Sequence, residues 1–257
     1  MEQRTVVLPY RHCVEPVHAV TEGLAMSEQK RAIRETGFTN CDVAAQVGGV
    51  HVLGGLHGHP LTIARLTGSI TRYEPDVVAV EACAEAISQY HPDVQDARWP
   101  PRDELEAAAY ATDRLYDLLL AGIDTRESEH SADFERFDRE IFTELGIIGS
   151  PDELTRATYY ELDLETIREW RALTEVRAPD AFTTVLAERD AVMAGHLHAL
   201  VSDEDIDTIV AMVGVQHLTG VVDLLRTPSE IPDDFVEIPP LAHYRLFPRD
   251  SPWSSAK

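Results

Sequence analysis

Two histidines stand in the same short pattern, G-x-x-H, and each copy follows an apolar run. Gly54 begins the first copy, which ends at His57, and Gly214 begins the second, which ends at His217. Neutral imidazole is a common metal ligand and a good general base. The duplicated pattern therefore predicts that the two histidines do chemistry together, although a histidine after a strand can also be a hydrogen-bonded structural residue.

A carboxylate and an arginine join this candidate set. Glu81 directly follows the apolar run 77–80, where a carboxylate is costly unless it is paired or used. It can also cap a helix or be solvated. Arg189 falls on the apolar face of a helix predicted over 181–201, so it should point inward and need a partner. That partner is either a carboxylate of the site or substrate, or a structural acid of the core.

Three apolar runs would position these residues. The runs 50–53, 77–80 and 209–213 are predicted to be buried parallel strands, because strands covered on both faces are continuously apolar. In open α/β sheets, ligands bind outside the carboxyl ends of the strands. A helix over 61–72 would join the first two strands into a β-α-β unit with Glu81 and His57 on one edge.

The first turn has further signals. Pro60 suits the first turn of a helix, so His57 should lie beside a helix N-terminus, which favours an anion or a developing oxyanion. Gly54 and Gly214 are expected to permit a positive φ and a close backbone approach at the two turns.

The remaining chain is predicted to complete one α/β domain over 1–257. It has an N-terminal extension at 1–45, a mainly helical insertion at 85–205 and a surface tail at 239–257. In the N-terminal extension the sequence predicts a strand at 5–8, a helix at 17–35 and a short element at 42–46. In the insertion it predicts a helix at 103–121, a strand-like return at 123–124, a helix from a capping box at 150–153, a helical pattern at 167–176 and Asp180 as the N-cap of the helix 181–201. Toward the end of the chain it predicts a helix at 221–225 and a strand at 235–238.

The composition is strongly acidic. The 257 residues include 45 Asp and Glu against 22 Lys and Arg, a net charge of −23, and the only lysines are Lys30 and Lys257. This predicts a halophilic protein whose self-repulsion is screened by a salt-rich cytoplasm, with an acidic mesophilic protein as the alternative. It argues against nucleic acid and anionic membranes as partners, because both need basic patches.

Cysteine usage and hydropathy predict a cytoplasmic protein. Cys13, Cys41 and Cys83 are odd in number and lack C-x-x-C spacing, so we expect reduced thiols rather than a disulfide framework or zinc knuckle. His12 and His18 have no spacing that fixes a metal site. No stretch has the length of a signal peptide or of a membrane-spanning helix.

Four patterns in this order resemble the TraB family of pheromone-shutdown proteins. The family is related to the Tiki metalloproteases and more distantly to erythromycin-esterase-like and ChaN-like folds. The patterns are the strand with G-x-x-H, P-D-V-V-A-V-E-x-C, E-R-D-x-x-M-A, and the strand with G-x-x-H-L-x-G, and they lie within about residues 48–226. The resemblance implies an α/β fold with a central, mostly parallel sheet that carries the duplicated motif. It also implies His57, Glu81, Arg189 and His217 as functional residues, with Gly54 and Gly214 as motif glycines.

The first functional hypothesis is a metal-assisted hydrolase that acts on a peptide or amide. His57 and His217 would bind or flank a divalent ion, and Glu81 would bind it or act as general base. Arg189 would hold a substrate carboxylate or stabilise the oxyanion. These donors suit Zn²⁺, Mn²⁺ or Co²⁺ alike. Without a metal, a His–Glu pair would activate water directly.

The second hypothesis is a non-catalytic module that sequesters a peptide or a small anionic ligand in the same cleft. The TraB family usually has an arginine shortly after the E-x-C pattern, whereas residues 84–86 contain none. This departure leans toward the second hypothesis. Either hypothesis expects a peptide or small-molecule partner and leaves the oligomeric state open.

Overall fold

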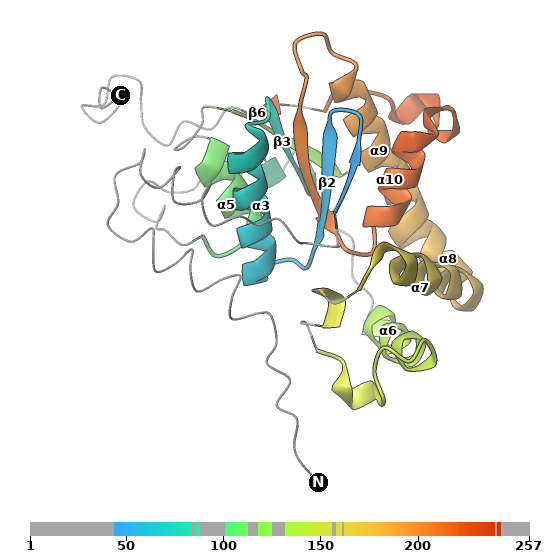
Figure 1. Ribbon diagram of the computed structural model, residues 1–257. Helices are drawn as coiled ribbons and strands as arrows, with labels where there is room; N and C mark the ends of the chain where they lie inside the picture. Colours follow the sequence, from blue (N-terminus) through green and yellow to red (C-terminus); the bar gives the residue numbers. More distant parts are fainter. Residues whose placement is uncertain are drawn as a thin grey trace, which may run out of the picture.

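The apolar runs of the sequence form the centre of a sheet in the computed structural model of the chain (Figure 1). The structure describes residues 44–83, 86–87, 101–112, 118–124, 132–155, 158–160, 162–239 and 241–242. The expected strand at 5–8, the expected helix at 17–35 and the residues His12, Cys13, His18 and Cys41 lie outside this part of the chain. In the part described, no helix has both the length and the apolar character needed to cross a membrane.

The described strands form one six-stranded sheet in the order β1-β2-β5-β3-β4-β6. The four inner strands, β2, β5, β3 and β4, are parallel, and the edge strands β1 and β6 are antiparallel to their neighbours. The strands are β1 (Ala44–Val47), β2 (Val50–Gly55), β3 (Val77–Cys83), β4 (Leu119–Asp124), β5 (Ile209–Gly214) and β6 (Leu241–Ala242). This confirms the α/β class and the mostly parallel sheet.

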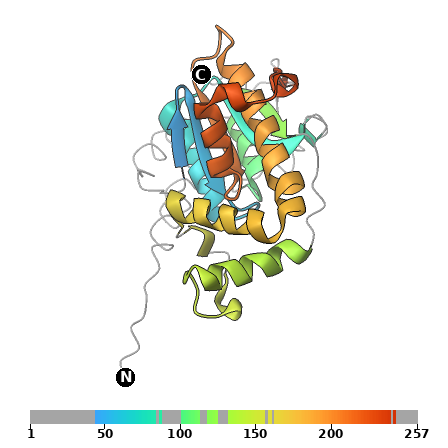
Figure 2. The same cartoon turned by 90° about the vertical axis from the view of Figure 1, so that its right-hand side faces the viewer.

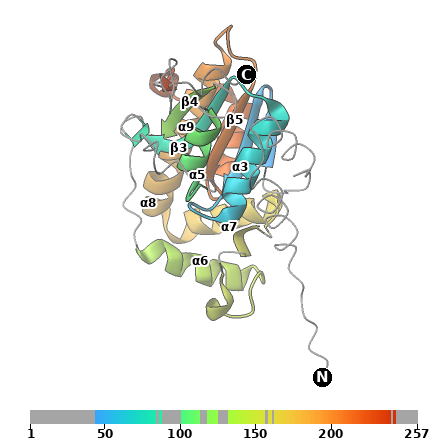
Figure 3. The ribbon, with the colours of Figure 1, turned by 90° about the vertical axis from the view of Figure 1, so that its left-hand side faces the viewer.

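Helices cover both faces of the sheet, which is why the inner strands are continuously apolar. Helices α3 (Pro60–Tyr73) and α5 (Glu104–Tyr110) cover one face (Figure 3). Helices α9 (Glu188–Val201) and α10 (Leu218–Arg226) cover the other (Figure 2). Alternate residues of β5 divide between the two cores: Ala211 packs on the α9 side and Met212 on the α3 side.

A further helical layer lies beyond the carboxyl ends of the parallel strands. Helices α6 (Ala132–Glu144) and α7 (Leu164–Arg177) lie below the sheet in Figures 1 and 2. Phe142 and Trp170 join them through an edge-to-face contact with ring centroids 4.9 Å apart. The short helix α8 (Pro179–Ala181) and the π-helical η4 (Phe182–Ala187) lead from α7 into α9.

The middle of the chain differs from the prediction in one important way. Helix α5 confirms only the start of the helix predicted over 103–121 and ends at Tyr110, whereas Leu119, the last apolar residue of the predicted pattern, belongs to strand β4. The strand-like return predicted at 123–124 is the end of the same strand. Five consecutive residues of β4, Leu120 to Asp124, are buried, as expected for a strand covered on both faces. The range 85–205, predicted as a mainly helical insertion, therefore also supplies an internal strand of the sheet.

Other boundaries also differ. The capping box at 150–153 begins only a 3-10 turn, η2 (Pro151–Glu153), followed by a second turn, η3 (Thr158–Tyr160). Helix α7 begins instead after Asp163, whose side chain accepts a hydrogen bond from the Thr166 amide. Asp180 lies inside a helical turn whose N-cap is Ala178.

The last predicted strand, 235–238, is wrong. The chain there forms 3-10 turns, η5 (Pro228–Glu230) and η6 (Asp233–Phe235), and then continues without regular structure to 239. A short strand, β6, pairs with β4 within the range predicted as a surface tail. The short elements predicted at 42–46 and 221–225 correspond to β1 and α10.

Candidate functional site

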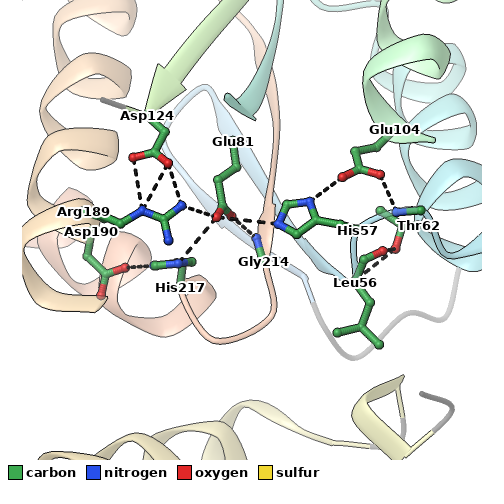
Figure 4. Close-up of polar contacts among 11 residues, drawn as sticks. Leu56, His57, Thr62, Glu81, Glu104, Asp124, Arg189, Asp190, Gly214 and His217 are labelled. Carbon is green, nitrogen blue, oxygen red and sulfur yellow. Dashed lines mark hydrogen bonds and ion pairs between the residues drawn. The ribbon is translucent and has the colours of Figure 1, made fainter. Parts of the chain in front are cut away.

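The two G-x-x-H turns leave the sheet side by side. Strands β2 and β5 are parallel neighbours, and their register pairs Gly55 with Gly214 at the ends of both strands. Strand β3 carries Glu81 to the same edge, and β4 ends there at Asp124 (Figure 4). The topology therefore places four chemically useful side chains at one carboxyl edge, as expected for an open α/β sheet.

Both histidines face one oxygen atom. His57 Nε2 lies 3.7 Å and His217 Nε2 lies 3.5 Å from Glu81 Oε1. The two nitrogens are thus separated by no more than the sum of these distances, well within the ~12 Å beyond which one ion or water could not bridge them. The structure brings His57, Glu81 and His217 together (Figure 4).

Arg189 points inward as its helical position predicts, and it lies between two carboxylates. Its Nη2 is 2.6 Å from Glu81 Oε1 and 2.5 Å from Asp124 Oδ2, and its Nε also donates to Asp124 at 3.1 Å. Burial alone would lower the pKa of Arg189, but the hydrogen bond with Asp124 and the charge of Glu81 raise it. Arg189 is therefore cationic and held by the site itself.

His57 is the open member of the pair, with 52% of its side chain exposed. Its Nδ1 contacts Glu104 Oε1 at the start of α5, and the other oxygen of Glu104 accepts from the Gly58 amide at 2.8 Å. The hydrogen bonds with Glu104 and Glu81 raise the pKa of His57 to about 10. The expected helix N-terminus is confirmed: α3 begins at Pro60, beside the turn that contains His57.

His217 is the buried member, with 5% of its side chain exposed. Its Nδ1 lies 2.7 Å from Asp190 Oδ1, and the other oxygen of Asp190 lies 2.5 Å from Arg171 Nη2. Because the ionised carboxylate only accepts hydrogen bonds, the His217 Nδ1–H donates to Asp190. The Nε2 atom is thereby directed toward Glu81.

Glu81 is the shared centre of the site. Its side chain is 4% exposed, and its Oε2 accepts a hydrogen bond from the Gly214 amide. Burial by itself would raise the pKa of Glu81, but His217, His57 and Arg189 hold it well below its usual range. The pKa of Glu104 is also lowered, since the hydrogen bonds from His57 and the Gly58 amide outweigh its burial. Both acids are therefore ionised.

The motif glycines show only part of the expected role: Gly214 permits a close approach, but neither Gly54 nor Gly214 has a positive φ. Among the described glycines, positive φ angles occur at Gly48, Gly58 and Gly146 rather than at Gly54 or Gly214. A Cβ atom on Gly214 would lie 3.1 Å from Glu81 Oε2 and 3.3 Å from the His217 ring. Gly214 is needed for close approach of the backbone to the site, and the left-handed turn residue after His57 is Gly58.

The donors suit a divalent ion, although Arg189 already binds the Glu81 oxygen that both histidines face. Two ligands about 2.1 Å from a tetrahedral ion are separated by about 3.4 Å, close to the spacing of each Nε2 from Glu81 Oε1. Carboxylates hold both Nδ1 atoms, as around metal-binding histidines. In the part of the chain described, however, no three His, Cys, Asp or Glu residues form a ready-made metal group. Glu81 would have to share its oxygen between Arg189 and the ion.

Sequence reasoning did not assign a role to three acids of the site. Asp124 has the same signal as Glu81, an acid at the end of an apolar strand, but only a short strand-like return was predicted at 123–124, and the start of β4 was predicted as helix. Asp190 follows Arg189 in the E-R-D pattern and was given no function. Glu104 is brought to His57 from 47 positions away, and no local pattern indicates that contact.

Comparison of the chain with protein-family models, with curated proteins and with solved structures gives no match. The geometry of the site therefore carries the function proposed for the protein.

Proposed function

We propose that the protein is a TraB-like hydrolase that cleaves a peptide or amide bond with a water molecule activated among His57, Glu81 and His217. The observation that carries this proposal is the convergence of two imidazole Nε2 atoms on one buried carboxylate oxygen. A histidine whose Nδ1–H is bound by a carboxylate is the arrangement that orients a general base in many hydrolases.

The environments of the two histidines suggest a division of roles. His217 is buried and oriented by Asp190, so its Nε2 is suited to accept a proton from water. His57 is exposed and favoured in its protonated form, so it is suited to donate a proton to the leaving group. Arg189 is held by Glu81 and Asp124, which favours a role in fixing Glu81 over binding a substrate carboxylate.

A divalent ion such as Zn²⁺, Mn²⁺ or Co²⁺ would be held by His57, His217 and Glu81. When bound, it would polarise the substrate carbonyl and lower the pKa of its water. The protein would contribute neutral imidazoles, whose orientation Glu104 and Asp190 already fix. Because a metal-bound imidazole must be deprotonated, ion binding would compete with the proton on His57.

The alternative is a peptide-binding module without catalysis. It is favoured by one observation: Glu81 is bound to Arg189 and to the Gly214 amide, so little of its basicity is available. A site in this state recognises ligands through its histidines and does not need to turn them over.

The test is a peptide-library cleavage assay at high potassium chloride concentration, with a chelator or with added Zn²⁺, Mn²⁺ or Co²⁺. Wild-type protein is compared with Glu81→Gln and with Arg168→Met, a control on α7 whose side chain forms an exposed ion pair with Asp223 of α10. Cleavage by the wild type and the control, and its loss in Glu81→Gln, would support the hydrolase. Saturable peptide binding without cleavage under any of these conditions would support the binding module and overturn the hydrolase.

A further inference from the structure

The helical layer below the sheet contacts the second G-x-x-H turn through Arg171 of α7. The Nη1 of Arg171 donates to the carbonyl oxygen of Gln216, the residue before His217. Its Nη2 lies 2.5 Å from Asp190 Oδ2. One guanidinium therefore binds both the backbone of the turn and the carboxylate that orients His217, using the planar two-sided geometry that lysine lacks.

This contact is buried and closely packed. The side chains of Arg171 and Asp190 are 12% and 2% exposed. Gly220 on α10 leaves room for the pair, because a Cβ atom there would overlap Asp190 Oδ2 and crowd Arg171 Nη2. Absence of a side chain at this position is thus required for the ion pair in its observed place.

A second residue of the layer holds the same turn. Asp138 of α6 accepts hydrogen bonds from Gln216 Nε2 at 3.2 Å, from Trp170 Nε1 at 3.0 Å and from the Tyr159 hydroxyl at 3.1 Å. Gln216 is therefore bound at its carbonyl by α7 and at its side chain by α6. The two helices fix the residue that immediately precedes His217.

At the equivalent residue, the first G-x-x-H turn is bound by the helix that follows it. The Leu56 amide and carbonyl, at the position equivalent to Gln216, bond to the hydroxyl of Thr62 at 3.0 and 2.7 Å. Thr62 belongs to α3, the helix that directly follows the turn. The helical layer therefore binds the residue before His217, whereas the residue before His57 is bound by the helix that follows its own turn.

We propose that Arg171 is a positioning residue, through which the α6–α7 layer holds Asp190 against His217 and directs His217 Nε2 toward Glu81. Its importance for turnover rests on the proposed function, whereas its effect on the His217 ring does not. Loss of such outer contacts typically reduces metal affinity or activity by about 10- to 100-fold.

The experiment follows the exchange with solvent of histidine Nδ1–H protons, by NMR of protein labelled with ¹⁵N-histidine and without added metal. His196 is an internal reference, because it is on α9 and its buried Nδ1 bonds to the Ile123 carbonyl at 2.8 Å. In the wild type both the His217 and His196 protons should be protected. In Arg171→Met the His217 proton should exchange at least about tenfold faster, with His196 unchanged.

Two further variants keep the test decisive. Arg168→Met removes a cation three residues away on α7 that pairs with Asp223 at the surface, and it should change neither proton. Arg171→Lys keeps the charge and is the conservative variant if Arg171→Met does not fold; it should give an intermediate rate at His217. An unprotected His217 proton in the wild type would overturn the proposal. So would unchanged exchange in both folded Arg171 variants, or equal acceleration of His217 and His196.

A parallel titration with Zn²⁺ separates this proposal from the proposed function. If both hold, Arg171→Met should weaken Zn²⁺ binding by about 10- to 100-fold relative to Arg168→Met. If no variant binds Zn²⁺ or cleaves peptides but His217 exchange still accelerates in Arg171→Met, the positioning role stands and the metal-assisted function fails.

Discussion

The two G-x-x-H turns share a sequence pattern and a place in the sheet, but they differ in what holds them. At Leu56 the first turn is bound by its own helix through Thr62, and its half-exposed His57 is bound by Glu104. The second is bound by the distant residues Arg171 and Asp190 and presents a buried His217. The two motif histidines therefore face the same residue, Glu81, although His57 is exposed and His217 is buried.

This difference indicates how one site can combine precision with access. A buried histidine with a fixed ring provides a constant geometry, because its partners lose little entropy when a substrate binds. An exposed histidine can exchange protons with solvent and contact a substrate directly. The two histidines differ in this way because the acids that bind their Nδ1 atoms, Glu104 and Asp190, differ in burial and come from different helices.

The largest expected effect is the difference in unfolding free energy between variants of these two acids. Asp190→Ala should lower the free energy of unfolding by about 3–5 kcal/mol, because it leaves the buried Arg171 cation without its partner. Glu104→Ala should cost about 1 kcal/mol or less, because its histidine partner is half exposed. Urea denaturation at constant high salt measures both values. Equal losses would show that the two turns are held equally strongly.

Glu81, the carboxylate that both turns face, should be energetically coupled to Arg189. Arg189→Lys keeps the charge but loses the planar geometry that reaches Glu81 and Asp124 together. In a cycle with Glu81→Gln, the two substitutions should deviate from additivity by about 0.5–3 kcal/mol of unfolding free energy. Melting and ligand binding of wild type, both single variants and the double variant provide the test. Additive effects would remove Arg189 from the site.

A smaller change should act on the first turn alone. Thr62→Val has nearly the same shape but removes the hydroxyl that binds both the Leu56 amide and its carbonyl. We expect a loss of about 1 kcal/mol in unfolding free energy. Histidine NMR should show a change at His57 and none at His217. A change at both would mean that the turns are not held independently.

Salt should stabilise the whole protein, and it should weaken the contact at the first turn more than the contact at the second. With a net charge of −23, thermal stability should rise with potassium chloride as self-repulsion is screened. The cost of Glu104→Gln should shrink along this series because the contact with His57 is partly exposed, while the cost of Asp190→Asn should persist. Stability that stays flat or falls with salt would contradict the halophilic character predicted from composition.

The smallest effect concerns pH, because solvent screens the interactions of the half-exposed His57 side chain. Since the folded state raises the pKa of His57 from 6.5 to about 10, its protonation stabilises the fold fully below pH 6.5. This contribution is lost as the pH rises through about 10. In the presence of a chelator, urea midpoints of wild type should therefore fall over this interval more than those of His57→Gln. Parallel curves for the two proteins would show that His57 has no raised pKa.

The sequence predicted the parts of the fold that depend on continuous apolar runs. Strands β2, β3 and β5 were located because each is buried on both faces. The start of β4, residues 119–121, was mistaken for the end of a helix, because a short apolar run fits the period of a helix or of a strand. Only the end of this strand, 123–124, was predicted as strand-like. The 3-10 turn at Pro151 shows that a capping signal starts a turn but does not determine its length.

For the site, the sequence identified residues whose chemistry is unusual for their position. His57, Glu81, Arg189 and His217 do meet, because strand order places β5 between β2 and β3. The acids around them could not be assigned, since their roles depend on contacts made across the chain. Arg171 is the clearest case: its partners Asp190 and Gln216 are 19 and 45 positions away, and nothing in its own helix distinguishes it from Arg168.

The central claim is that the two turns form one catalytic centre. Its most direct test is the rate of peptide cleavage by wild type, His57→Ala, His217→Ala and the double variant. Groups that act as a unit lose activity together, so the double variant should be no slower than the slower single variant. A double variant whose loss is the product of the two single losses would contradict the claim.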